Sequence, residues 1–103
     1  MSDIKLESEY SDLDKFSRYG DIYYYKKNEN IRHNPYGPAF ICRDGSKIYI
    51  INSKYHRLDG PAVIYLNGKE VYYINDKQLS KEEFEVHPER LKFIGKEHLA
   101  CLG

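Results

Sequence analysis

The chain contains two adjacent stretches that read HNPYGPAFICRDGSKIYIINSKY, residues 33–55, and HRLDGPAVIYLNGKEVYYINDKQ, residues 56–78. They align without a gap at a period of 23 residues, and ten of the 23 positions are identical. A fixed short period is typical of proteins built from repeated supersecondary units. A less regular third copy, shifted by one residue, lies upstream in residues 19–33, where a glycine, a tyrosine cluster and a histidine are kept.

Each stretch has the residue pattern of a β-hairpin. Asp44-Gly45 and Asn67-Gly68 separate runs rich in β-branched and aromatic residues. These dipeptides favour a two-residue type I′ turn, in which both turn residues have a positive φ. Such a turn sets the register, and paired residues share a face of the sheet. The register pairs Ile41 with Ile48 and Ile64 with Val71. One face then carries Ala39, Ile41, Ile48, Ile50, Ala62, Ile64, Val71 and Tyr73, and the other carries Phe40, Tyr49, Ile51, Val63, Tyr72 and Ile74.

The connections between the hairpins carry residues suited to turns. Gly60 can adopt a positive φ, Pro61 restricts the start of the next strand, and Asp59 can cap the turn through its side chain. The histidine recurs at one position of the period, which favours a role in the turn over a role in catalysis. The positions expected to be structural are His33, Gly37, Pro38, Gly45, His56, Asp59, Gly60, Pro61 and Gly68.

The C-terminal part has the pattern of a helical cap. Ser80 and Glu83 match a capping box, so a short helix is predicted over about residues 81–87. Pro88 suits a first helical position, and Gly95 is expected to end the turn after it. The tail from residue 96 onward fits either a strand or a frayed end.

At the other end, residues 11–14 predict a short helix that carries Leu13 and Phe16 and stops at Gly20. The predicted organisation is a single domain over residues 1–103, with an acidic N-terminal cap (1–18), hairpin repeats (19–79) and a helical C-terminal cap and tail (80–103). The fold class is mainly β within α+β: an antiparallel β-meander of 23-residue hairpin repeats with short helical caps at the ends.

The pattern GPA-x-I-x-x-D/N-G-x-x-I/V-Y-x-I-N-x-K-x-H-R-x-D-GPA describes these stretches. It resembles the variant MORN repeats, and it looks closest to small HR-x-DGPA repeat proteins of bacteriophages and large DNA viruses. The resemblance covers about residues 19–85, and such proteins often end in a short helix like LSKEEFE, residues 79–85. It implies the hairpin architecture and no shared activity, although related variants occur in antitoxin-like proteins and standard MORN proteins are linked to membranes and scaffolding. The first stretch departs from the pattern, because residues 33–36 read HNPY where residues 56–59 read HRLD.

Composition excludes several classes of protein. The 16 basic and 16 acidic residues cancel, which argues against a basic nucleic-acid coat. No apolar run approaches the roughly 20 residues of a membrane helix, and the acidic, polar N-terminus does not resemble a signal peptide. Cys42 and Cys101 have no CxxC spacing, which argues against a disulfide scaffold or a zinc ribbon. We therefore expect a cytoplasmic protein in a reducing setting, without a membrane.

Catalysis and metal binding are not expected. His56 with Asp59 could form a base and its orienting group, but His33 lacks the matching acid and no nucleophile elbow is present. The histidines lack the spacing of metal ligands, and no Gly-rich phosphate loop occurs. The sequence thus predicts no enzyme, no metal and no cofactor.

Aromatic and cationic residues supply the candidate binding face. Rings beside Lys and Arg can stack bases and hold phosphates, while the same rings also suit a core or a protein interface. A protein interface fits better than nucleic acid, because tyrosine buries area at low entropic cost and keeps a polar group. The candidate residues are Tyr24, Phe40, Arg43, Tyr49, Arg57 and Tyr72.

Three functions compete on these observations. The leading hypothesis is a phage or viral accessory protein, an origin implied by the resemblance alone, that binds and inhibits a host defence protein in the host cytoplasm. It predicts an exposed aromatic and cationic sheet surface. The second is a homo-oligomeric sponge that sequesters a nucleotide signalling molecule in a cationic pocket between subunits. The third, implied by the resemblance alone, is an antitoxin-like or scaffolding repeat protein. An enzyme is the least favoured hypothesis, because it would need a second acid or base within hydrogen-bond reach of His56.

Overall fold

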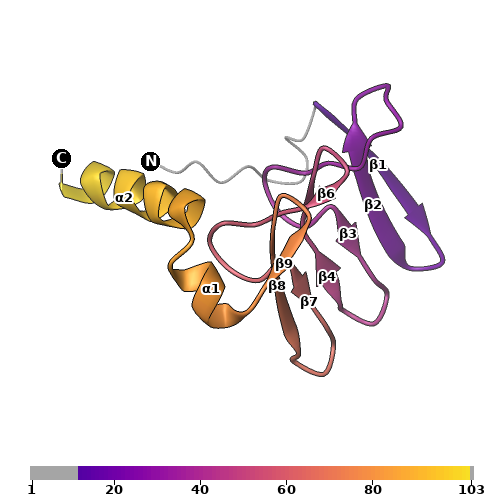
Figure 1. The fold of residues 1–103 in the computed structure, drawn as a ribbon. Coiled ribbons are helices and arrows are strands. Elements are labelled where there is room, and N and C mark those ends of the chain that lie inside the picture. The colour runs from indigo at the N-terminus through magenta and orange to yellow at the C-terminus, as the bar shows by residue number, and fades with distance from the viewer. Residues whose placement is uncertain (1–11, 103) are drawn as a thin grey trace.

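The computed structural model describes residues 12–102, with side-chain surroundings for residues 12–95 (Figure 1). Within that part, nine strands are followed by two helices. The strands are β1 (Leu13–Arg18), β2 (Asp21–Lys26), β3 (Phe40–Ile41), β4 (Lys47–Ile48), β5 (Ile50–Ile51), β6 (Lys54–Tyr55), β7 (Val63–Ile64), β8 (Glu70–Ile74) and β9 (Lys77–Leu79). The helices are α1 (Lys81–Glu85) and α2 (Pro88–Leu102).

Seven of these strands form one antiparallel meander. Their order in the sheet is β1-β2-β3-β4-β7-β8-β9, so each strand pairs with the next one along the chain apart from one excursion. The excursion is the two-stranded ribbon of β5 and β6, which leaves the sheet between β4 and β7. Both helices come after the last strand and lie at that end of the meander (Figure 1). The predicted mainly-β meander and its C-terminal helices are confirmed.

The predicted hairpin register is wrong by one residue. Ile48 pairs with Phe40, and Val71 pairs with Val63. The turns between these strands have three residues, because the Cys42 N–H donates to the Ser46 carbonyl and the Gly45 N–H donates back to Cys42. A type I turn followed by a glycine of positive φ closes such a loop, whereas a type I′ turn needs positive φ at both residues. A one-residue shift moves one strand of each hairpin to the opposite face.

Glycine takes the positive φ in both of these turns. The φ values are 100° at Gly45 and 89° at Gly68, and Asp44 and Asn67 have no positive φ. Instead, the side-chain oxygens of Asp44 and Asn67 accept the backbone N–H two residues later, at 2.8 and 2.9 Å. This local bond is an Asx-turn. The two-residue turns in which both residues have a positive φ lie elsewhere, at Tyr19-Gly20, Asn52-Ser53 and Asn75-Asp76.

The N-terminal helix predicted from Ser11 is wrong. Residues Leu13–Arg18 form strand β1, which pairs with β2 along all six of its residues. A helix of one or two turns is marginal in water, so continuous pairing with a neighbouring strand outweighs it. The acidic run at residues 1–11 lies outside the described residues.

The C-terminal prediction is partly correct. Helix α1 begins after Ser80 with both hydrogen bonds of the predicted capping box to Glu83, and it ends at Glu85. Gly95 does not end the next element, because α2 continues through it to Leu102. No atom outside the helix lies within 4 Å of a Cβ built at Gly95. Residues 96–102 are therefore helical rather than strand or frayed coil. No helix in residues 12–102 is long and apolar enough to cross a membrane.

Most of the buried residues of the sheet lie on one face of the meander, while Val63, also buried, lies on the other. The register aligns tyrosines that alternate with two alanines and a leucine across neighbouring strands of the former face: Tyr24, Ala39, Tyr49, Ala62, Tyr72 and Leu79. Among them, Tyr24, Ala39, Ala62 and Leu79 are buried. Ile74, Leu79 and Phe84 of α1 form a buried cluster at the C-terminal end, and Leu58 and Tyr72 pack against it. The short helix α1 therefore covers the last strands rather than the middle of the sheet.

Candidate binding site

The six residues of the predicted binding face do not share a surface. Tyr24 is 4% exposed and belongs to the core. Tyr72 packs on Phe84, with ring centroids 4.7 Å apart. Phe40 lies on the opposite face of the sheet, where it stacks on Tyr23. The one-residue register shift explains why Phe40 lies on the face opposite to Tyr49 and Tyr72, because it moves one strand of each hairpin to the other face than the type I′ turn predicts.

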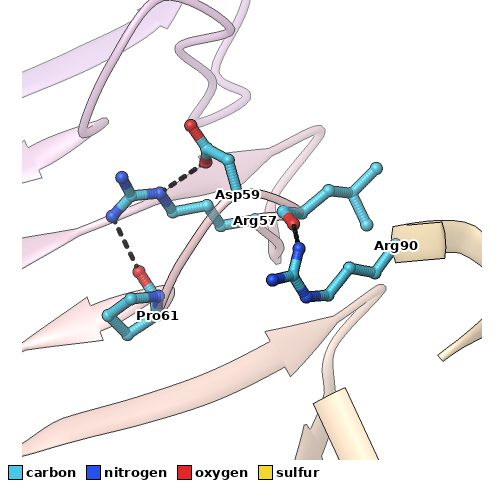
Figure 2. Close-up of polar contacts among 5 residues, drawn as sticks. Arg57, Asp59, Pro61 and Arg90 are labelled. Carbon is cyan, nitrogen blue, oxygen red and sulfur yellow. Dashed lines mark hydrogen bonds and ion pairs between the residues drawn. The ribbon is translucent and has the colours of Figure 1, made fainter. Parts of the chain in front are cut away.

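Arg57 makes hydrogen bonds within the turn that contains it (Figure 2). Its Nε donates to Asp59 Oδ1 at 2.7 Å and its Nη1 donates to the Pro61 carbonyl at 3.1 Å. Its Cζ lies 4.0 Å from the centre of the Tyr49 ring, a cation–π contact. Gly60 has no positive φ; a Cβ there would lie 3.0 Å from Arg57 Cζ. Glycine leaves room for the Arg57 guanidinium, which a Cβ would displace by a few tenths of an ångström, and the prediction of a left-handed turn residue at Gly60 is wrong.

Asn34 takes the corresponding place in the first stretch. It stands 23 residues before Arg57, and its Nδ2 donates to the Pro38 carbonyl at 2.9 Å, as Arg57 does to Pro61. Its Oδ1 accepts the Tyr36 N–H at 2.9 Å, and the residue is only 3% exposed. The substitution of HRLD by HNPY therefore preserves one hydrogen bond of the turn. Sequence reasoning missed Asn34, although an amide four residues before the same proline was a visible signal.

The two histidines make identical contacts. His33 Nδ1 accepts the backbone N–H of Asn52, and His56 Nδ1 accepts that of Asn75, both at 3.0 Å. Burial lowers the pKa of each imidazole below its ordinary value. A nitrogen that accepts a hydrogen bond must be unprotonated, so both contacts need the neutral ring. Asp59 binds Arg57, and no contact joins it to His56 among the described residues.

An exposed groove lies on the other face of the first hairpin. It has a volume of about 650 Å³ and is formed by β1, β2 and the segment after β2. Phe16, Tyr23 and Tyr25 provide its aromatic walls, and Phe16 is 55% exposed. Phe16 meets the Tyr25 ring edge-on, with centroids 5.5 Å apart. The register pairs Phe16 with Tyr23, so these rings share a face by strand alternation.

Two arginines flank these rings. Arg32 Cζ lies 5.8 Å from the centre of the Tyr23 ring, and Arg18 also lines the groove. Neither guanidinium makes an ion pair with a described residue. The carboxylate of Asp14 accepts the Asn28 N–H at 2.8 Å and lies 3.5 Å from Lys27 Nζ, while Glu29 contributes a second acid to the lining. We call Phe16, Arg18, Tyr23, Tyr25 and Arg32 the aromatic groove.

The remaining predicted residue, Arg43, is exposed in the β3–β4 turn, where its N–H donates to Asp21. It lies outside the lining of the aromatic groove.

No group of three or more His, Cys, Asp or Glu that could hold a metal ion occurs in the described part of the chain. No family model, no curated protein and no solved structure matches this chain.

Proposed function

We propose that the chain is a non-catalytic binding protein that recognises another protein through the aromatic groove. The observation that supports this function is the grouping of three rings and two arginines on an exposed face. Tyrosine and arginine are enriched at the energetic centres of protein interfaces, where they bury a large area and keep a polar group. Following the sequence resemblance, we propose that the partner is a host protein and that binding inhibits it.

The absence of catalysis is part of this proposal. The nearest candidate for an acid–base pair is His56 with Asp59. His56 Nδ1 is occupied by the Asn75 N–H, and Asp59 binds Arg57 at 2.7 Å. Both groups therefore support turns, which favours a binding protein over an enzyme.

We also propose that residues 33–55 and 56–78 are two copies of one hairpin unit of the variant MORN type. Equivalent hydrogen bonds 23 residues apart support this assignment. They include the histidine–asparagine contacts, the bonds to the proline carbonyls, and the three-residue turns that end in glycine. Units of this type would serve here as a scaffold that carries the first hairpin.

A partner-capture experiment tests the proposed protein-binding function. The tagged full-length chain and its Arg32→Glu and Tyr25→Ala variants are used to capture proteins from a bacterial lysate. Leu66→Ala is the matched control, because Leu66 is 68% exposed and lies in the distant β7–β8 turn. We expect a stoichiometric partner that wild type and Leu66→Ala retain and that both groove variants bind at least about tenfold more weakly. Retention by the groove variants would refute the assignment of the surface.

A nucleotide is the second candidate ligand, and the same groove supports it. A volume of about 650 Å³ lies within the range of small-molecule sites. Its rings could stack a base, and Arg18 and Arg32 could hold phosphates. Native mass spectrometry of protein purified without denaturation separates the two functions. A homo-oligomer with an added mass of a nucleotide, lost on denaturation, would support the sponge, whereas a bare chain with a stoichiometric protein would support the leading proposal.

A further inference from the structure

The two edges of the seven-stranded sheet differ. Among the described residues, one edge is β9, which has three residues and packs against α1. The other edge is β1, which has six residues and an exposed Phe16. Proteins usually shorten or cover the edges of their sheets, because exposed strand edges pair with other strands. The long edge at β1 is therefore a candidate for pairing with another chain.

The register of β1 determines its backbone directions. The Tyr24 N–H donates to Ala39 on β3, so the neighbouring Tyr23 directs its backbone groups to β1. Phe16 is the partner of Tyr23, and Asp14 and Arg18 lie two residues either side of it. Their backbone groups thus point to β2, and those of the alternate residues point to the outer edge. On an added antiparallel strand, Asp14, Phe16 and Arg18 would occupy non-hydrogen-bonded positions, where opposed side chains are closest.

The side chains of β1 are complementary to themselves. When two β1 strands run antiparallel with Phe16 opposite Phe16, Asp14 of each copy stands opposite Arg18 of the other. Opposite charges directly across a sheet are stabilising, and so are paired aromatic rings. Shifting this register by two residues one way places Lys15 opposite Lys15, and shifting it the other way places Arg18 opposite Phe16. Both shifts lose the two Asp14–Arg18 pairs; the first brings Asp12, which precedes β1, opposite Arg18, but it also places the like charges of the two Lys15 side chains opposite each other.

Both members of the charge pair can accept a new contact. Arg18 is exposed and has no ion pair among the described residues. Asp14 uses one oxygen for the Asn28 N–H and lies 3.5 Å from Lys27. A carboxylate offers about four acceptor positions, so a guanidinium can be added to it.

We propose that a second copy of this chain pairs with the first through β1, antiparallel and with Phe16 on the two-fold axis. The pairing joins the two meanders into one continuous sheet, with the same patch used by both copies. A two-fold axis perpendicular to the sheet keeps both aromatic grooves on the same face. This inference goes beyond the proposed function and does not depend on what the groove binds.

A charge exchange tests the proposed dimer. Sedimentation of the full chain is measured for wild type, Asp14→Arg, Arg18→Asp and an equimolar mixture of the two variants. We expect wild type to dimerise and each variant alone to dissociate about tenfold more readily, because each places two like-charge pairs across the axis. The mixture should regain wild-type dimerisation, because every opposed pair is then Arg with Asp. A monomeric wild type, or a mixture that stays monomeric while both variants show wild-type circular dichroism, would overturn the proposal.

A cross-link gives a second readout, in case Asp14→Arg does not fold. Phe16→Cys and the control Ser17→Cys are placed in a chain whose Cys42 and Cys101 are serine. Non-hydrogen-bonded partners have Cα atoms about 4.5 Å apart, within reach of a disulfide. We expect oxidation to link Phe16→Cys into a dimer and to leave Ser17→Cys largely unlinked, because Ser17 has no identical residue opposite it. Equal linking of both variants would contradict the register.

Discussion

Residues 33–55 and residues 56–78 make the same turns but different strands. In both, a histidine Nδ1 accepts an asparagine N–H and a side chain donates to a proline carbonyl. In the second stretch, β8 runs unbroken from Glu70 to Ile74. In the first, the equivalent strand is divided at Tyr49 into β4 and β5. Tyr49 donates its N–H to Ala62 on one side and accepts the His56 N–H on the other.

The segment that comes next in the chain explains this difference. The first stretch is followed by another hairpin, so β4 pairs with β7 and the ribbon of β5 and β6 leaves the sheet. The second stretch is followed by α1, so β9 pairs back on β8 and Phe84 covers Ile74. Similar residues therefore make the same local turns, while neighbours distant from the turn decide how the strands continue.

The largest expected effect is a loss of stability on alanine substitution at two equivalent positions, Ile51 in the first stretch and Ile74 in the second. Ile74 is 3% exposed and packs in the cluster with Phe84, whereas Ile51 is only half-buried. Ile74→Ala should lower the free energy of unfolding by about 3–4 kcal/mol, and Ile51→Ala by about 1–2 kcal/mol. Urea unfolding with unchanged m values measures both. Equal losses would mean that the helix cover contributes nothing to the difference between the stretches.

The next effect compares the two side chains that bind a proline carbonyl. Asn34→Ala should lower the free energy of unfolding by about 2–3 kcal/mol, because the Tyr36 N–H and the Pro38 carbonyl lose their partner in a buried place. Arg57→Ala should cost about 1 kcal/mol, since water can reach part of its site. Thermal or urea unfolding measures both variants.

Asp59→Ala is the control for this pair. Its side chain is 59% exposed, so loss of the ion pair with Arg57 should change the stability by no more than about 0.5 kcal/mol. If Arg57→Ala costs as much as Asn34→Ala, the two turns depend equally on this hydrogen bond.

Alanine substitution should lower the stability by a similar amount in the two glycine-containing hairpin turns. Gly45 and Gly68 have φ values of 100° and 89°, and a Cβ would meet no crowded neighbour at either position. Gly45→Ala and Gly68→Ala should each cost about 1–2 kcal/mol through backbone conformation alone. Chemical denaturation of the two variants measures the costs. A clearly larger loss of stability at one position would show that the two turns differ in something other than backbone conformation.

The smallest expected effect is a shared dependence on pH. Desolvation lowers the pKa of His33, helped by Lys26 and opposed by Asp12; desolvation also lowers that of His56, opposed by Glu89. As the pH falls, the histidines of the unfolded chain therefore bind protons at a higher pH than those of the folded chain. Their contribution to stability is fully present above about pH 6.5 and is lost as the pH drops through the lowered pKa of each folded histidine. His33→Asn and His56→Asn keep an acceptor near the Nδ1 position without titrating. Melting temperatures at pH 7.5 and 5.5 should differ less in each variant than in wild type, and an unchanged difference would exclude the imidazoles as its source.

Several features were predictable because they depend on a few neighbouring residues. The capping box needs only Ser80 and Glu83, and the structure contains both of its hydrogen bonds. Asp44-Gly45 and Asn67-Gly68 mark the positions of the hairpins. The length of those turns was not predictable from the dipeptide, because both a two-residue and a three-residue loop can end in glycine. The additional turn residue placed one strand of each hairpin on the face opposite to the predicted one.

The candidate site shows the same limit. In the run Tyr23-Tyr24-Tyr25, strand alternation requires the middle ring to point away from the other two. Sequence reasoning selected Tyr24 for binding, but packing buries Tyr24 and leaves Tyr23 and Tyr25 in the aromatic groove. No local property distinguishes the three rings, since each has the same preference for a half-buried strand.

The sequence by itself determined where the chain turns, where α1 begins, and that hairpins succeed one another in order. These features arise from φ preferences and side-chain bonds that span about four residues. Only the tertiary structure decided the register, the covered face, the break at Tyr49 and the rings left exposed. These choices depend on which side chains meet across strands and under α1, and on the burial that results, so they belong to the assembled sheet rather than to any one segment.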